Sequence, residues 1–185
     1  SLYFWQAENN MTWNSGKFQA LRLGSNNTLK EETLLFTDSM AQVIEPTEEV
    51  KDLGVLFASD ATFKNQRRSA VRKTSNKTSW VLRTFRTRAP GPMRTLWRSL
   101  CQPHQDYASQ LWSPVDSPGE LAAQEAPLRS FTRRIVGLRD TPYWERLAEC
   151  KLLSTDRRQE RYKIIYAWKI IQGMVPNCGM TFSNP

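Results

Sequence analysis

Short hydrophobic segments separated by turn residues dominate the first third of the chain. Compact or alternating apolar runs of this length are typical of β-strands, and Gly, Asn and Pro mark the turns between them. Before them, residues 5–13 have the pattern of a helix end. The predicted strands are residues 17–23, 34–36, 41–44 and 50–57. In the last of these, Leu53, Val55 and Phe57 alternate with polar or small residues, as in a half-buried strand.

From Phe63 onward the hydrophobic period becomes helical. Residues 63–87 form a long predicted helix, and Pro90-Gly91-Pro92 ends it. Its expected apolar face is Val71, Thr78, Leu82 and Phe85. The next helix begins at Pro92, because proline suits the first helical position. Its stripe has the i, i+3, i+4, i+7 spacing of an amphipathic helix and consists of Met93, Leu96, Trp97 and Leu100.

Three further helices are predicted in the C-terminal half. Residues 120–138 have an inward face of Leu128, Phe131, Ile135 and Leu138. Thr141-Pro142 opens a short helix, and Ser154 caps a last one that Gly173 ends. The apolar face of the last helix is Ile164, Ile165, Trp168 and Ile171. The sequence therefore predicts an α+β protein, with short strands in residues 1–62 and helices in residues 63–185.

Charge divides the chain at the same place. Residues 1–62 carry four basic and nine acidic side chains, a balance of −5, whereas residues 63–185 carry 22 basic and nine acidic ones, a balance of +13. Between Phe63 and Gln105 there are eleven basic residues and no Asp or Glu. A block of one sign predicts a polyanionic partner, because each Lys or Arg near a phosphate releases condensed counterions. The alternative is a solvated basic face on an ordinary domain.

Nucleic-acid contacts are assigned to the basic side chains of this block. The candidates are Arg67, Arg68, Arg72, Lys73, Lys77, Arg83, Arg86 and Arg88. Aromatic residues are interleaved with them and could stack on bases. For Phe85 and Trp97, however, the helical spacing favours a place in the core.

Sequence signs of catalysis are weak. Two-metal polymerase chemistry needs clustered carboxylates, and the chain has no adjacent Asp pair and no phosphate-binding glycine loop. We therefore predict no metal or other cofactor in this chain. An enzyme built on Cys101 and His104 is the least favoured of the hypotheses, since a lone His in a Pro-bounded segment is more often a surface or structural residue. The three cysteines are scattered, which favours a reducing compartment. The chain also has no long apolar run and no signal peptide. We therefore predict an intracellular protein, nuclear or cytoplasmic, without a membrane partner.

Several strings of the sequence resemble one family in their order and spacing. They are Asn9-Asn10-Met11-Thr12-Trp13-Asn14 with Lys17-Phe18-Gln19, Val50-Lys51-Asp52-Leu53-Gly54-Val55, Trp80-Val81-Leu82-Arg83-Thr84-Phe85, Asp106-Tyr107-Ala108-Ser109-Gln110-Leu111-Trp112-Ser113-Pro114, Tyr143-Trp144-Glu145-Arg146-Leu147 and Arg157-Arg158-Gln159-Glu160-Arg161-Tyr162. Together they resemble the C-terminal part of LINE-type (non-LTR retrotransposon) reverse transcriptases of the jockey-like group. The resemblance covers nearly the whole chain.

The resemblance implies a right-hand polymerase of which residues 1–62 would be the end of the palm and residues 63–185 the thumb with its extension. The intact parent would be an RNA-directed DNA polymerase that uses Mg²⁺, and its upstream palm and fingers would carry the catalytic aspartates. Within this chain, the resemblance gives Lys17 the role of an auxiliary general acid, and Leu53, Gly54 and Val55 the place of a primer-grip turn. The helical part would bind RNA or an RNA–DNA duplex through its phosphates.

Two expectations follow from these observations. The first is a catalytically inactive fragment of a reverse transcriptase that grips template–primer nucleic acid. The alternative is a protein-interaction module or decayed remnant, whose sign would be an exposed apolar patch of Trp5, Trp13 and Phe18.

Overall fold

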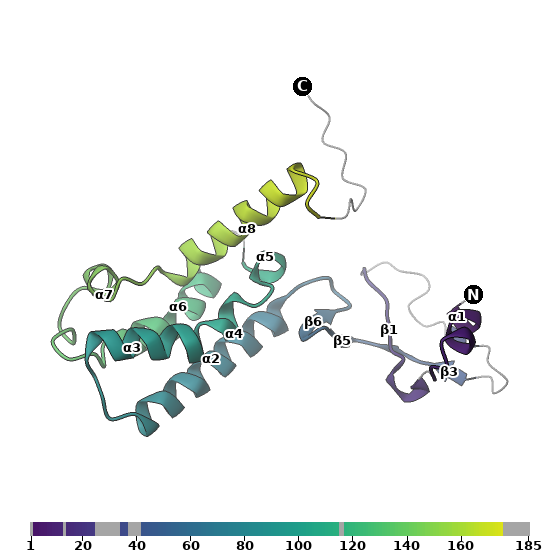
Figure 1. Ribbon diagram of the computed structural model, residues 1–185, viewed down its shortest axis with the longest axis horizontal. Coiled ribbons are helices and arrows are strands. Elements are labelled where there is room, and N and C mark those ends of the chain that lie inside the picture. The colour runs from purple at the N-terminus through teal and green to yellow at the C-terminus, as the bar shows by residue number, and fades with distance from the viewer. Residues whose placement is uncertain (1, 13, 25–33, 37–41, 115–116, 176–185) are drawn as a thin grey trace. The chain divides into compact units, whose positions relative to one another are not determined.

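The computed structural model describes residues 2–12, 14–24, 34–36, 42–114 and 117–175 (Figure 1). The chain forms two compact units, Ser1–Asn65 and Gln66–Pro185. The first unit holds the described strands, and almost all of the helical structure belongs to the second. The α+β class predicted from the sequence is therefore confirmed at this level.

The first unit consists of short elements, among them three two-stranded sheets in its described residues. β1 (Ala20–Leu21) pairs in parallel with β4 (Pro46–Thr47). β2 (Leu34–Phe36) and β3 (Gln42–Ile44) are antiparallel, as are β5 (Glu49–Asp52) and β6 (Val55–Ala58). A helix α1 (Leu2–Glu8) and a 3₁₀ turn η1 (Ser15–Lys17) precede the strands. The predicted strand at 17–23 is thus only two residues long, and the helix at 5–13 ends at Glu8.

The predicted strand at 50–57 is wrong, because the chain turns back on itself at Leu53 and Gly54. Both residues have positive φ, 44° and 88°, as a two-residue hairpin turn of type I′ requires. Asp52 pairs with Val55 across the turn. Glycine adopts this conformation readily, whereas a leucine there is uncommon, so the apolar alternation through Leu53 was misleading.

The second unit is helical. Its elements are α2 (Lys64–Thr84), α3 (Pro90–Leu96), the π-helical turn η2 (Trp97–Cys101), α4 (Pro103–Asp106), α5 (Ser109–Trp112), α6 (Pro118–Thr132), α7 (Tyr143–Glu149) and α8 (Thr155–Ile171). One hydrophobic core joins α2, α3, η2, α6 and α7. At its centre Trp97 and Phe131 are fully buried, with their ring centroids 5.1 Å apart. Met93, Leu128 and Leu147 pack into the same cluster.

The buried face of α2 agrees only in part with the predicted one. It consists of Gln66, Ala70, Thr74, Thr78 and Val81. Thr74 satisfies its hydroxyl within the helix by donating to the Ala70 carbonyl, 2.8 Å away. Leu82 and Phe85 pack against the core while partly exposed, and Val71 is only half-buried. Thr78, Leu82 and Phe85 of the predicted face therefore do face the core. The prediction missed Gln66, Ala70, Thr74 and Val81, because small and polar residues form most of the buried face.

The helix α6 ends at Thr132, six residues before the predicted end at Leu138. Gly137 follows with a φ of 79°, a left-handed conformation that glycine tolerates best. Ile135 and Leu138 are nevertheless buried, as predicted, because the turn after α6 folds back onto the core. This early end is what positions the loop between α6 and α7.

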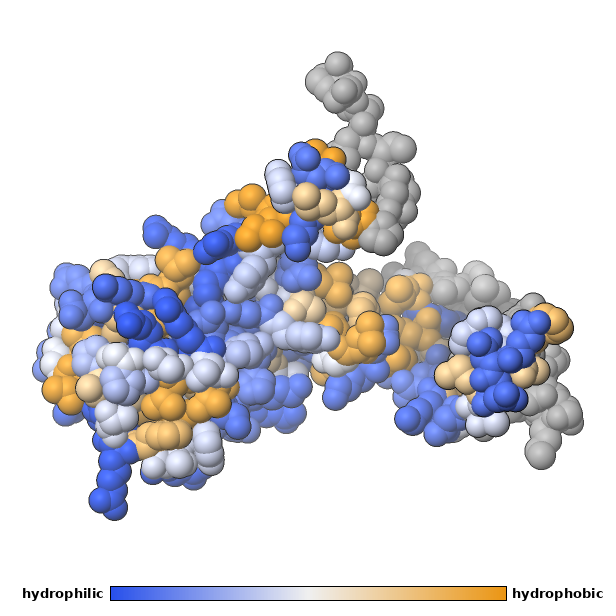
Figure 2. All heavy atoms as spheres, viewed as in Figure 1, coloured by the Kyte–Doolittle hydropathy of each residue, from blue (hydrophilic) through white to orange (hydrophobic). Residues whose placement is uncertain are grey.

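The helix α8 is packed at its start and exposed towards its end. The hydroxyl of Ser154 caps it by accepting from the Arg157 amide, which confirms the predicted cap. Its first turns contact α4, α5 and α6. The apolar face further along is exposed, with Ile164 at 64%, Trp168 at 50% and Ile171 at 65%, and Figure 2 shows hydrophobic residues at the surface along this helix.

Candidate nucleic-acid interface

The outward face of α2 carries a row of free arginines. Arg68, Arg72 and Arg83 are exposed on the side of the helix opposite the buried face. In the described part of the chain none of the three makes a hydrogen bond or an ion pair, and α2 contains no acidic residue. At 1.5 Å per residue the row is about 22 Å long. We call it the α2 basic face (Arg68, Arg72 and Arg83).

A second group of positive charges lies along one flank of α2. Lys73 is exposed, and the Lys77 ammonium lies over the Trp80 ring, 4.7 Å from its centroid. The positive charges of both lysines also affect the titration of His104 in α4. Burial lowers the pKa of His104, and the charges of Lys77 and Lys73 lower it further. Trp80 is 41% exposed, so an aromatic surface accompanies these charges.

Two of the predicted contact residues are engaged within the fold. Arg67 forms an ion pair with Glu120, 2.9 Å between Nε and Oε2, and donates to the Trp112 carbonyl. The guanidinium of Arg88 donates to the carbonyls of Leu82, Phe85 and Thr87, which caps the C-terminal end of α2. The structure thus separates these two from the exposed Arg68, Arg72, Lys73, Arg83 and Arg86.

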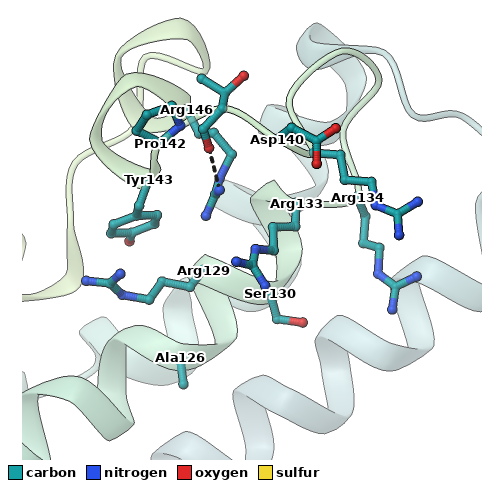
Figure 3. Close-up of a pocket in the computed structure, with 11 residues that line it drawn as sticks. Ala126, Arg129, Ser130, Arg133, Arg134, Asp140, Pro142, Tyr143 and Arg146 are labelled. Carbon is teal, nitrogen blue, oxygen red and sulfur yellow. Dashed lines mark hydrogen bonds between the residues drawn. The ribbon is translucent and has the colours of Figure 1, made fainter.

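A pocket that the sequence analysis missed lies between α6 and α7. Its volume is about 860 Å³, and its basic side chains come from α6, the turn after it, the following loop and α7. Figure 3 shows Arg129, Arg133 and Arg146 directed into it. We call it the arginine pocket, after Arg129, Arg133, Arg134, Arg139 and Arg146. The only sequence signal was the density of arginine between residues 129 and 146, which does not reveal that three of these side chains point into one pocket.

Arg146 is the buried member of the arginine pocket, with a 4% exposed surface. Its Nε donates to Thr132 Oγ1 at 3.1 Å and its Nη1 to the Thr141 carbonyl at 2.7 Å. Burial lowers the pKa of Arg146, and the charges of Arg133 and Arg129 lower it further. The ion pairs in the described residues involve none of the pocket arginines, so this positive charge has no carboxylate partner.

The residues singled out by family resemblance lie in the first unit. Lys17 ends the turn η1 and is exposed. Leu53, Gly54 and Val55 form the β5–β6 hairpin, with Leu53 84% exposed and Val55 buried. Trp5 is 50% exposed and Phe18 half-buried, whereas Trp13 lies outside the described residues. Because Trp13 lies outside the described residues, the structure does not test the apolar patch expected from these three aromatics.

The structure gives little support to an enzyme site built on Cys101 and His104. Cys101 is fully buried, and burial raises the pKa of its thiol, the opposite of what activates a cysteine nucleophile. Over the described ranges, no three His, Cys, Asp or Glu side chains gather in a way that could hold a metal ion. Among the described helices, none combines the length and hydrophobicity needed to cross a membrane.

Comparisons of this chain with protein-family models, with curated proteins and with solved structures found no match.

Proposed function

We propose that this chain is a nucleic-acid-binding piece of a LINE-type reverse transcriptase, in which the helical unit grips the phosphates of a template–primer duplex. In this proposal residues 1–62 are the end of the palm and residues 63–185 the thumb with its extension. RNA or an RNA–DNA duplex is the partner, together with the palm and fingers of the same polyprotein. Mg²⁺ and the catalytic aspartates belong to the parent polymerase, so the chain alone has no turnover.

The observation that carries the proposal is the α2 basic face. Arg68, Arg72 and Arg83 are exposed and unpaired within the described residues, on a helix that has no acidic side chain. Arginines that serve folding are engaged, as Arg67 and Arg88 are. A row of free guanidinium groups of this length suits the backbone of a duplex, which is recognised through its phosphates without regard to sequence.

The test is a fluorescence-anisotropy titration of a labelled RNA–DNA hybrid at several salt concentrations. If five phosphates are neutralised, the logarithm of the affinity should fall with the logarithm of the salt concentration with a slope of about −3 to −4.5. Substitution of Arg68, Arg72 and Arg83 together by Gln should make the slope shallower by about 2 to 2.7 and weaken binding roughly 100-fold.

The matched control removes the same charge from another helix. Arg157, Arg161 and Lys169 are exposed on α8, and their combined substitution by Gln should change the slope much less. Equal losses in the two triple variants would mean that net charge alone attracts the hybrid. That result, or no binding by the wild-type chain at low salt, would overturn the proposal.

A second candidate function, protein–protein interaction, is favoured by the exposed apolar face of α8. Ile164, Trp168 and Ile171 are each at least half exposed and lie on one side of the helix. Sedimentation of the full chain tests it: self-association that Trp168→Asp abolishes would support an interaction surface. A monomer at all concentrations would leave this function without support from the chain itself.

A further inference from the structure

The arginines that line the arginine pocket come from different elements. Arg129, Arg133 and Arg146 point into it, whereas Figure 3 shows Arg134 extending away from these three. Arg129 belongs to α6, Arg133 follows the end of α6, and Arg146 belongs to α7 (Figure 3). Arg134 and Arg139 line the same pocket. Guanidinium groups that converge without a carboxylate to neutralise them form a site for an anion with several acceptor oxygens, such as a phosphate.

The fold holds Arg146 in place before any ligand arrives. Its bonds to Thr132 and Thr141 fix the plane of the guanidinium, while within the described residues Nη2 has no hydrogen-bond partner. Tyr143 supports the same arrangement: Arg129 lies over its ring at 4.1 Å and Arg146 at 5.4 Å. The hydroxyl of Tyr143 is itself anchored on Glu125. Little side-chain entropy therefore remains to be lost when a phosphate binds.

Repulsion within the pocket also favours an anion. Arg129 and Arg133 place positive charge close enough to the buried Arg146 to disfavour its ionised form. Asp140 lines the pocket, but within the described residues it makes no ion pair with any of these arginines. A bound phosphate would relieve this repulsion, because it places negative charge between the guanidinium groups.

An aromatic platform adjoins the pocket. Trp144 follows Tyr143 in α7, is 61% exposed, and has its ring centroid 5.1 Å from that of Tyr143. Arg129 lies 6.0 Å from the Trp144 ring. An exposed indole next to a phosphate site is the combination that binds single strands, in which unpaired bases are free to stack.

We propose that the arginine pocket binds a phosphate of single-stranded nucleic acid and that Trp144 stacks on an adjacent base. This second site would lie in the same helical unit as the α2 basic face, and the inference rests on the proposed nucleic-acid-binding function. A duplex fits it less well, since paired bases cannot leave their stack to reach Trp144.

The experiment is an anisotropy titration of the full chain with a labelled eight-nucleotide oligouridine at one low salt concentration. Arg133→Gln and Trp144→Ala should each weaken binding about tenfold. Both side chains are exposed, so neither substitution is expected to unfold the protein. The matched controls are Arg157→Gln and Tyr166→Ala, exposed residues of α8, which should stay within about twofold of wild type.

An abasic oligonucleotide of the same length separates the phosphate contact from the stacking contact. Arg133→Gln should weaken its binding as it does for oligouridine, whereas Trp144→Ala should have no effect. An equal loss from Trp144→Ala with both ligands would overturn the stacking role. Affinities within twofold of wild type for both pocket variants would overturn the inference as a whole.

The RNA–DNA hybrid distinguishes this inference from the proposed function. Arg133→Gln and Trp144→Ala should leave hybrid affinity within about threefold of wild type, while the triple substitution in the α2 basic face lowers it. If the α2 variant loses hybrid binding but the pocket variants keep their single-strand affinity, only the pocket inference fails. A wild-type chain that binds neither ligand at low salt contradicts both.

Discussion

The α2 basic face and the arginine pocket use the same side chain in opposite ways. On α2, Arg68, Arg72 and Arg83 point to solvent, and folding requires nothing of them. In the pocket, Arg146 is buried and hydrogen-bonded, and neighbouring arginines repel it. An open row can follow a continuous backbone, whereas a concave cluster can hold one phosphate. The comparison teaches that charge density alone does not define a binding surface. A guanidinium that already donates hydrogen bonds within the fold has fewer donors free for a ligand.

The largest expected difference between the two regions is in stability. Arg146→Ala should lower the free energy of unfolding by about 2 to 3 kcal/mol, because it removes two hydrogen bonds from a charged donor in a buried site. Arg72→Ala should change it by less than about 0.5 kcal/mol, as exposed substitutions usually do. Urea denaturation measures both. If Arg146→Ala were as mild as Arg72→Ala, the pocket would not be held by the fold.

The next prediction concerns whether Arg67 belongs to the nucleic-acid-binding surface of α2. Its ion pair with Glu120 should contribute about 1 kcal/mol to stability, a modest value because Glu120 is partly exposed. A double-mutant cycle of Arg67→Gln and Glu120→Gln measures this coupling by urea denaturation. Arg67→Gln should also weaken hybrid binding less than Arg68→Gln does. An equal loss of affinity would place Arg67 in the binding surface despite its ion pair.

For Arg133, another arginine of the pocket, we expect a substitution to raise stability, opposite to the loss expected for Arg146→Ala. Because its charge lies near that of Arg146, Arg133→Gln should relieve repulsion and raise the free energy of unfolding by about 0.3 to 0.5 kcal/mol, a small gain since Arg133 is exposed. The same substitution on α2, Arg68→Gln, should leave stability unchanged. A clear loss of stability in Arg133→Gln would mean that this side chain supports the fold.

The smallest expected effect is a dependence of stability on pH at the flank of α2. Burial, Lys77 and Lys73 keep the folded-state pKa of His104 below its ordinary value of 6.5. Between that value and the lowered one the unfolded chain binds more protons, so stability should fall as the pH drops below about 6.5. His104→Gln should flatten this part of the profile, measured as the urea midpoint. An unchanged profile would contradict the origin given for the pKa shift.

The sequence predicted the fold best where large hydrophobic residues recur at regular helical spacing. Met93 and Trp97, and likewise Leu128 and Phe131, have helical spacing, and all four are buried in one core. It failed where the decisive residues are small, polar or conformationally unusual. The buried face of α2 is largely Thr, Ala and Gln, and the β5–β6 turn places a leucine at positive φ.

The two candidate sites also differ in how far the sequence can predict them. Helical periodicity within one element is enough to place Arg68, Arg72 and Arg83 on one face, so the sequence could predict that row. The arginine pocket depends on where α6 ends and how α7 folds back beside it. Arg129 and Arg146 are seventeen positions apart, and only tertiary packing brings them to the same Tyr143 ring. Likewise, the pairing of Arg67 with Glu120 could not be read from either local segment.

The most direct test of the central claim is the salt dependence of RNA–DNA hybrid binding by the wild-type chain and by the triple Gln variant of the α2 basic face. We predict a slope of about −3 to −4.5 for the wild type and one shallower by about 2 to 2.7 for the variant. A slope near zero for the wild type, or the same slope for both proteins, would contradict the claim that this face grips nucleic acid.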